Sequence, residues 1–155
     1  MALVIRRSRS RVAAVFLLCC SLLLFGFATD QARAGQITTD RAVVLELTNE
    51  ARDHKDRDAL ELDRALSRYA VRHSRAMARE GELFHSENLA AVLQGRNWEM
   101  GGENVGVGSS LSALQAAFMR SPPHRRNILS EGYDHTAIGV VQSDGNFWVT
   151  VIFYG

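Results

Sequence analysis

Residues 138–153 read IGVVQSDGNFWVTVIF and consist of two apolar, β-branched runs on either side of a short polar segment. That segment, Ser143-Asp144-Gly145-Asn146, is typical of a hairpin turn, because Asp-Gly pairs tolerate the positive φ angles that tight turns need. In the second run both alternating sets of side chains are mostly apolar, so we expect other layers to cover both faces of this strand. The stretch therefore predicts a β-hairpin inside a layered domain.

Two segments upstream of the hairpin, 38–52 and 63–80, carry apolar residues at helical spacing. In the second segment Asp63 stands at the N-cap position, and Gly81 stands where a helix normally stops. Its apolar positions form one stripe, which consists of Leu66, Tyr69, Ala70, His73 and Met77. We therefore expect two amphipathic helices here.

The remaining segments are shorter. We expect a short helix within 86–93 and another that ends at Arg120, before the helix-breaking Ser121-Pro122-Pro123. Residues 101–108, GGENVGVG, are too rich in glycine for a helix and predict a short strand or turn, whereas the highly charged 53–61 predicts a solvated turn. Since helices come first and strands last, the fold class is α+β.

The N-terminus has the three parts of a secretory signal peptide. Four arginines within 6–11 form a basic flank, 12–27 form a 16-residue apolar run, and Ala32-Arg33-Ala34 has the small residues of a cleavage site. The run is shorter than the roughly 20 apolar residues of a membrane-spanning helix. We expect residues 1–34 to be removed, which leaves a mature domain, 35–155, without a transmembrane anchor and exported to an extracellular or periplasmic location.

Removal of the signal changes the charge and the cysteine count. The whole chain has 18 basic and 17 acidic residues; residues 1–34 hold five arginines and Asp30, so the mature domain keeps 13 basic and 16 acidic residues, a net charge of −3. With only the short Arg125-Arg126 pair, it lacks the basic footprint of a nucleic-acid-binding protein. Cys19 and Cys20 both leave with the signal, so the exported domain is expected to be disulfide-free.

Four residues are candidates for chemistry because of their surroundings. His85 lies in Phe84-His85-Ser86, His124 follows the Pro122-Pro123 pair, His135 follows Asp134, and Glu103 lies between Gly102 and Asn104. Imidazoles and a carboxylate from separate loops are suitable ligands for zinc, and they are equally suitable as a proton-transfer pair.

Structural roles are the alternatives for these residues. Glu103-Asn104 has the hydrogen-bonding groups to organise a turn, and His124 stands where a residue caps or packs a helix start. His135 precedes a strand, and the alternative for it is an exposed residue without a chemical role. No H-E-x-x-H or similar local spacing decides among these readings.

The order of the motifs adds a resemblance to a known family. They are, along the chain, Asn49-Glu50-Ala51-Arg52, His73-Ser74, His85-Ser86, Gly102-Glu103-Asn104, the segment SPPHRRNIL at 121–129, and Ile138-Gly139-Val140 before a terminal aromatic strand. In this order the chain resembles the CAP superfamily of cysteine-rich secretory, antigen 5 and pathogenesis-related proteins. Within it, the chain looks most similar to the compact bacterial SCP-domain proteins, from about Asp40 to Gly155.

This resemblance implies a three-layer α-β-α sandwich with a mainly antiparallel sheet. It also implies a cleft in which two histidines and two glutamates bind a divalent metal. Matched by position, the first histidine is His85, the first glutamate is Glu103, and the last histidine is Asp134 or His135, depending on a one-residue shift. The second glutamate falls near Ser121, so that carboxylate is missing.

His124 lies in the Ser-Pro-x-His-Arg element that bacterial members commonly carry, and the resemblance implies that it faces the same cleft. The cleft and metal candidates are therefore His85, Glu103, His124 and His135, with zinc or another divalent cation as the candidate cofactor.

Three function classes compete, and the first is favoured. It is a secreted, non-catalytic binding module, whose ligand is a cell-envelope component, a lipid or a protein; the mature domain has no G-x-S-x-G motif and no cysteine. The alternative is a divalent-metal-dependent hydrolase of peptide or envelope substrates, in which His85, Glu103 and one of the later histidines hold a cation that activates water. A structural or stress-related protein with a vestigial cleft is a third reading.

Overall fold

A four-stranded mixed sheet is the centre of the fold, with the strand order β1-β3-β4-β2. The computed structural model describes the backbone of residues 10–155 and the side chains of residues 31–155. Strands β3 (His135–Ser143) and β4 (Asn146–Tyr154) form the expected antiparallel hairpin. Asp144 and Gly145 have φ angles of 50° and 75° at its turn, which is the geometry of a type I′ hairpin.

The two outer strands differ in direction. β2 (Gly101–Gly108) pairs antiparallel with β4, so the glycine-rich segment is a strand. β1 (Glu61–Leu62) pairs parallel with β3. The expectation of a wholly solvated turn over 53–61 is therefore wrong at its end, where Leu60 is buried and Glu61 begins a strand. The reason is a non-local pairing, because the Glu61 and Asp63 N–H groups donate to the carbonyls of Asp134 and Thr136.

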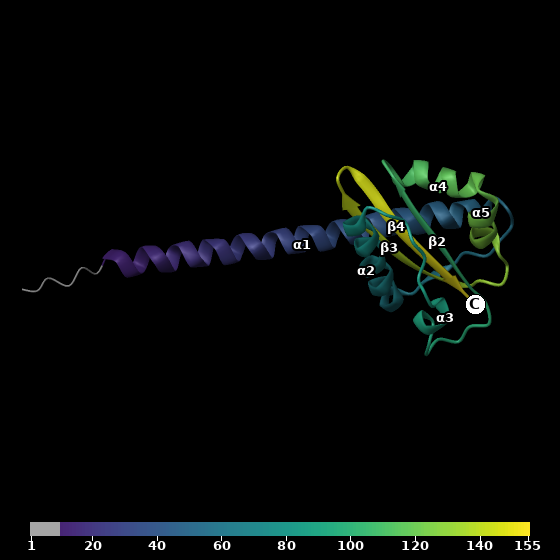
Figure 1. Ribbon diagram of the computed structural model, residues 1–155, viewed down its shortest axis with the longest axis horizontal. Helices are drawn as coiled ribbons and strands as arrows, with labels where there is room; N and C mark the ends of the chain where they lie inside the picture. Colours follow the sequence, from purple (N-terminus) through teal and green to yellow (C-terminus); the bar gives the residue numbers. More distant parts are fainter. Residues whose placement is uncertain (1–9) are drawn as a thin grey trace, which may run out of the picture. The chain divides into compact units, whose positions relative to one another are not determined.

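One face of the sheet is covered by α2 (Arg64–Glu80), with the short α3 (Leu89–Val92) beside it (Figure 1). As expected, the Asp63 side chain caps α2 by accepting from the Leu66 N–H, and Gly81 ends it with a φ of 68°. Gly139 on β3 lets the α2 backbone approach closely, since an added Cβ would lie 2.1 Å from the Ala70 carbonyl carbon. The core on this face consists of Leu66, Ala70, Leu93, Ala137, Ile152 and Tyr154.

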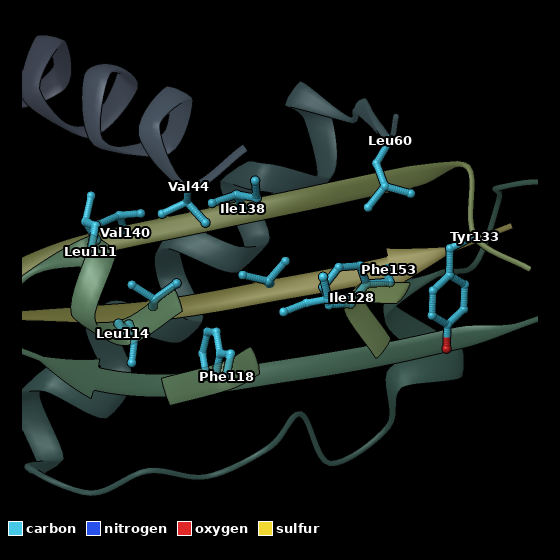
Figure 2. Close-up of a cluster of buried hydrophobic side chains, with 12 residues drawn as sticks. Val44, Leu60, Leu111, Leu114, Phe118, Ile128, Tyr133, Ile138, Val140 and Phe153 are labelled. Atoms are coloured by element: carbon cyan, nitrogen blue, oxygen red, sulfur yellow. The ribbon is translucent and has the colours of Figure 1, made fainter. Parts of the chain in front are cut away.

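The opposite face is covered by the C-terminal part of α1 (Ser10–Asp53), by α4 (Leu111–Arg120) and by α5 (Pro122–Leu129). Figure 2 shows the apolar cluster between these helices and the sheet. Its buried residues are Val44, Leu60, Leu111, Leu114, Phe118, Ile128, Tyr133, Ile138, Val140, Val149, Val151 and Phe153. The fold is therefore the three-layer α-β-α sandwich that was predicted, and β4 is covered on both faces.

Residues 1–36 and residues 37–155 form two separate units of the chain. The arginines that carry the signal-peptide prediction at residues 6, 7 and 9 lie outside the described residues, so the removal of 1–34 stays a prediction. Within the part of the chain whose side chains are described, we find no helix with both the length and the apolar composition of a membrane span.

Candidate functional site

Glu103 is the buried centre of the candidate site. It lies on the edge strand β2, opposite Ile152 of β4, and its side chain is only 5% exposed. Its Oε1 accepts from the Ser86 hydroxyl at 2.7 Å, and its Oε2 accepts from the Ser86 backbone N–H at 2.9 Å. The Ser86 hydroxyl in turn accepts from Tyr69 of α2 at 2.9 Å. Both carboxylate oxygens are thus held by the chain segment that follows α2.

His85 places an imidazole over this carboxylate. Its Nδ1 lies 2.8 Å from Glu103 Oε2, and its side chain is 61% exposed. Because a carboxylate only accepts hydrogen bonds, Nδ1 carries the proton of this contact and Nε2 is directed elsewhere. A carboxylate that orients a histidine in this way is the arrangement found behind many metal-bound or proton-transferring imidazoles.

A pair of asparagines fixes α5 against β2 beside Glu103. Asn104 is fully buried, and its Nδ2 donates to the His124 carbonyl at 3.1 Å. The Asn127 side-chain amide donates to Asn104 Oδ1 at 2.9 Å and to the Glu103 carbonyl at 3.2 Å. These bonds determine where α5, and with it His124, lies relative to Glu103.

His124 brings a second imidazole to the site. Its Nδ1 lies 2.8 Å from the Ser121 hydroxyl, and its ring packs against Phe118 with centroids 5.0 Å apart. Burial lowers the pKa of His124 below its ordinary value, and the positive charge of His85 lowers it further. Both imidazoles lie near Glu103: His85 bonds to its carboxylate, and the α5 segment of His124 is tied to β2 through Asn104 and Asn127. Ser121, where the resemblance implies a missing glutamate, is used to hold the second of them.

The structure does not bring His135 to these residues. It lies on β3, two strands away from β2, and its ring stacks on Tyr154 with centroids 5.0 Å apart. Its Nδ1 is 2.5 Å from Asp134 Oδ1, and its Nε2 is 3.8 Å from Glu61 Oε2. Both residues that competed for the last histidine position are thus bonded to each other, away from Glu103.

The donor set fits a cation only in part. Within residues 31–155, whose side chains are described, no three His, Cys, Asp or Glu side chains lie close enough together to hold a metal ion. The two oxygens of Glu103 already accept from Ser86 and His85, which leaves the two imidazoles as the groups with a ring nitrogen to offer. The arrangement therefore supports an exposed, oriented histidine more directly than a four-ligand site.

Sequence reasoning missed the roles of Ser86, Tyr69 and Asn127. Ser86 and Asn127 were visible only as members of motifs, and Tyr69 only as part of an apolar stripe. The one available signal was that Ser86 follows His85 directly, since a single residue with an N–H and a hydroxyl is well suited to hold both oxygens of a carboxylate.

Comparisons with known proteins agree with this architecture. The family model "CAP: Cysteine-rich secretory protein family" matches residues 45–153. The uncharacterized protein YkwD of Bacillus subtilis is 30% identical over 112 residues, which cover 68% of this chain and 43% of that protein. The chain thus spans less than half the length of this curated relative.

Solved structures show the same fold. An extracellular protein with an SCP domain from Bacillus anthracis aligns with a TM-score of 0.67 at 25% identity, over 76% of this chain and 41% of that one. A cysteine-rich secretory protein from Staphylococcus aureus aligns with a TM-score of 0.64 at 24% identity, over 77% and 39%. The family match covers more than half of the residues and includes the strand of Glu103, the helix of His124 and the terminal hairpin. This chain belongs to the CAP, or cysteine-rich secretory protein, family.

Proposed function

We propose that this chain is an exported, non-catalytic binding module that recognises a cell-envelope, lipid or protein ligand through the cleft at His85 and His124. The observation that carries the proposal is the state of the Glu103 carboxylate. It is 5% exposed and accepts hydrogen bonds from Ser86 on both oxygens and from His85 on one. A carboxylate held in this way, with three of its roughly four acceptor positions already used, orients its neighbour rather than standing free as a base.

The group that this arrangement offers to a ligand is the exposed ring of His85. Its Nδ1 is fixed by Glu103, so the ring is oriented in advance and its Nε2 is left for a partner. An oriented group costs less conformational entropy on binding than a free one. This favours recognition of a ligand that carries a hydrogen-bonding group.

The class of partner is inferred from the setting of the domain. The signal-peptide prediction directs the chain out of the cytoplasm, and the Bacillus anthracis protein with the same domain is described as extracellular. Envelope components, lipids and other exported proteins are what such a domain meets. Both the export of this chain and the ligand are parts of the proposal.

The test is capture of the partner from the native host. Tagged full-length chain, recovered from the host, is extracted under denaturing conditions for bound lipid and is used in parallel to pull down envelope proteins. We expect a ligand that is lost with His85→Ala and kept with His54→Ala, a matched control at an exposed histidine outside the site. Wild-type protein that is repeatedly empty, or a ligand that both variants keep, contradicts the proposal.

A divalent-metal-dependent hydrolase of peptide or envelope substrates is the second candidate. It is favoured by one observation: the imidazoles of His85 and His124 both have their Nδ1 held, by Glu103 and by Ser121, which leaves Nε2 of each as a ligand. Zinc bound by His85 and His124 would supply a water molecule activated at neutral pH. Glu103 would orient His85, and Ser86 would hold Glu103.

Zinc uptake separates the two candidates. The hydrolase requires micromolar zinc to raise the melting temperature of the wild-type chain and to leave that of His85→Ala and His124→Ala unchanged. It also requires zinc-dependent cleavage of envelope peptides. If zinc changes neither stability nor cleavage, the second candidate fails and the binding module stands.

A further inference from the structure

A cavity of about 420 Å³ lies apart from the histidine site, at the C-terminal end of α1. It is formed by Arg52 of α1, by the loop after α1 and by the loop before β3, and it shares no residue with the His85–Glu103 site. Its volume is within the usual range for small-molecule sites. The residues that line it are Arg52, Asp56, Arg57, Asp58, Ala59, Glu131, Tyr133 and Asp134.

Arg52 forms the floor of this cavity as a buried cation without a carboxylate partner. The residue is 1% exposed, and four of its five N–H groups donate to backbone carbonyls, which belong to Asp58, Ile128, Ser130 and Tyr133. Among the described residues, the remaining N–H has no acceptor, and no Asp or Glu forms an ion pair with this guanidinium. The charge of Asp58 acts on this guanidinium only from beyond ion-pair distance. A buried charge without an ion-pair partner in contact is costly, which makes the floor receptive to an anion.

Arg57 adds a second cation beside the first. Its Nη1 forms an ion pair with Glu131 at 2.8 Å, while its Nε is buried and has no hydrogen-bond partner. Burial lowers the pKa of Arg52, the charge of Asp58 raises it, and the charge of Arg57 lowers it. The two arginines line the same cavity, and both have an N–H without an acceptor among the described residues.

The four carboxylates of the cavity divide into two pairs. Glu131 is bound to Arg57, and Asp134 lies against the ring of His135. Asp56 and Asp58 are exposed, and within the described residues neither has a side-chain hydrogen bond or an ion pair. The cavity thus combines a cationic floor with two carboxylates that form no ion pair or side-chain hydrogen bond among the described residues, and its lining residues carry four negative and two positive charges.

We propose that this cavity binds a free diamino acid, with the ligand carboxylate on the floor at Arg52 and Arg57 and its two ammonium groups at Asp56 and Asp58. One carboxylate and two ammonium groups match the unengaged charges of the cavity in sign and in number. A metal ion fits less well, because no three His, Cys, Asp or Glu side chains of the described part lie close enough together to hold one.

The experiment is a calorimetric titration of the purified full chain with L-lysine and two analogues. L-norleucine lacks the side-chain ammonium group, and cadaverine lacks the carboxylate. We expect saturable binding of lysine with a Kd below about 1 mM and at least about tenfold weaker binding of each analogue. The proposal is overturned if lysine gives no saturable signal, or if either analogue binds as tightly as lysine.

Variants locate the binding in the chain. Arg57→Gln and Asp58→Asn each remove a charge from the cavity and are expected to weaken lysine binding at least about tenfold. Arg125→Gln, at an exposed arginine outside the cavity, is the matched control and should bind as the wild type does. Arg52 is left unchanged, because its carbonyl bonds hold the fold. Equal binding by Arg57→Gln and Arg125→Gln would place lysine elsewhere and overturn the assignment.

Discussion

Ser86 holds both carboxylate oxygens of Glu103, with its N–H on Oε2 at 2.9 Å and its hydroxyl on Oε1 at 2.7 Å. The two residues are brought together from the segment after α2 and from the edge strand β2. This double contact keeps the carboxylate buried and directs it at His85. It is the arrangement on which the site depends.

Ser86→Ala should therefore destabilise the protein. The substitution leaves Glu103 Oε1 buried without its donor, and an unsatisfied buried polar group costs about 1–3 kcal/mol. Urea unfolding measures the loss in the free energy of unfolding. Ser109→Ala, at an exposed serine before α4, is the control and should change it by less than about 0.5 kcal/mol. Equal stability of the two variants would mean that Ser86 does not hold the carboxylate.

Gly139→Ala should separate α2 from the sheet. An added Cβ would lie 2.1 Å from the Ala70 carbonyl carbon and 2.3 Å from the Val71 nitrogen, and neither backbone group can move alone. We expect a loss near the upper end of the roughly 1–3 kcal/mol typical of overpacking, measured by thermal unfolding. Gly108→Ala on β2 is the control, because its Cβ would meet nothing closer than 3.6 Å. If both variants melt at the same temperature, the close approach of α2 is wrong.

His124 should make stability depend on pH. Burial, and then the charge of His85, lowers the pKa of His124 in the folded state, so folding favours the neutral ring. The resulting stabilisation is complete above the ordinary histidine pKa of about 6.5 and is lost as the pH falls through the lowered folded value. Unfolding at pH 7.5 and pH 5 measures it, and His124→Gln should reduce the difference between the two pH values.

Removal of the His85 imidazole tests whether His85 and His124 interact electrostatically. In His85→Gln the pKa of His124, followed by NMR, should rise, yet it should stay below the ordinary value because burial is the larger cause. His54→Gln is the matched control and should leave the His124 titration unchanged. If the pKa of His124 is the same in His85→Gln as in the wild type, the two rings do not interact.

Asp63→Asn should lower the pKa of Tyr154. Burial, and then the hydrogen bond to and the charge of Asp63, raises the pKa of Tyr154 to about 12, and the hydroxyl lies 3.0 Å from Asp63 Oδ2. The amide keeps an oxygen for the Leu66 N–H but loses the charge, so we expect a partial return towards 10. Ultraviolet absorbance in an alkaline titration follows the tyrosines, and Tyr69→Phe and Tyr133→Phe backgrounds assign the signal. An unchanged value contradicts the role of Asp63.

Asp56→Gly should stabilise the fold and impair the cavity. Asp56 has a φ of 54° after the end of α1, a conformation that glycine adopts more easily, so we expect a gain of about 0.5–1 kcal/mol in the free energy of unfolding. Lysine binding should fall at the same time, because one carboxylate is lost. Asp144→Gly, at a φ of 50° in the β3–β4 turn, is the control and should leave lysine binding unchanged. If Asp56→Gly binds lysine as tightly as the wild type does, Asp56 does not contact the ligand.

Local elements were the easiest part to predict. The α2 helix has its N-cap at Asp63 and its glycine stop at Gly81, and both signals depend only on neighbouring residues. The helix expected within 86–93 is shorter, Leu89–Val92, and starts at the Asn88 cap. β1 was missed because two residues form a strand only when a distant partner, here Asp134 to Thr136, supplies its hydrogen bonds.

By itself, the sequence determined the layered α+β class, the terminal hairpin, the absence of cysteine after residue 20 and the membership of the CAP family, because these depend on composition, periodicity and motif order. Only the tertiary structure decided which of the candidate site residues contact one another. Glu103 joins His85 across 18 residues, whereas His135 is bonded to the adjacent Asp134 on a strand two places away. The cavity at Arg52 was likewise invisible, since its charges come from the end of α1 and from two loops about 75 residues apart, and they converge only when α1 packs against the sheet.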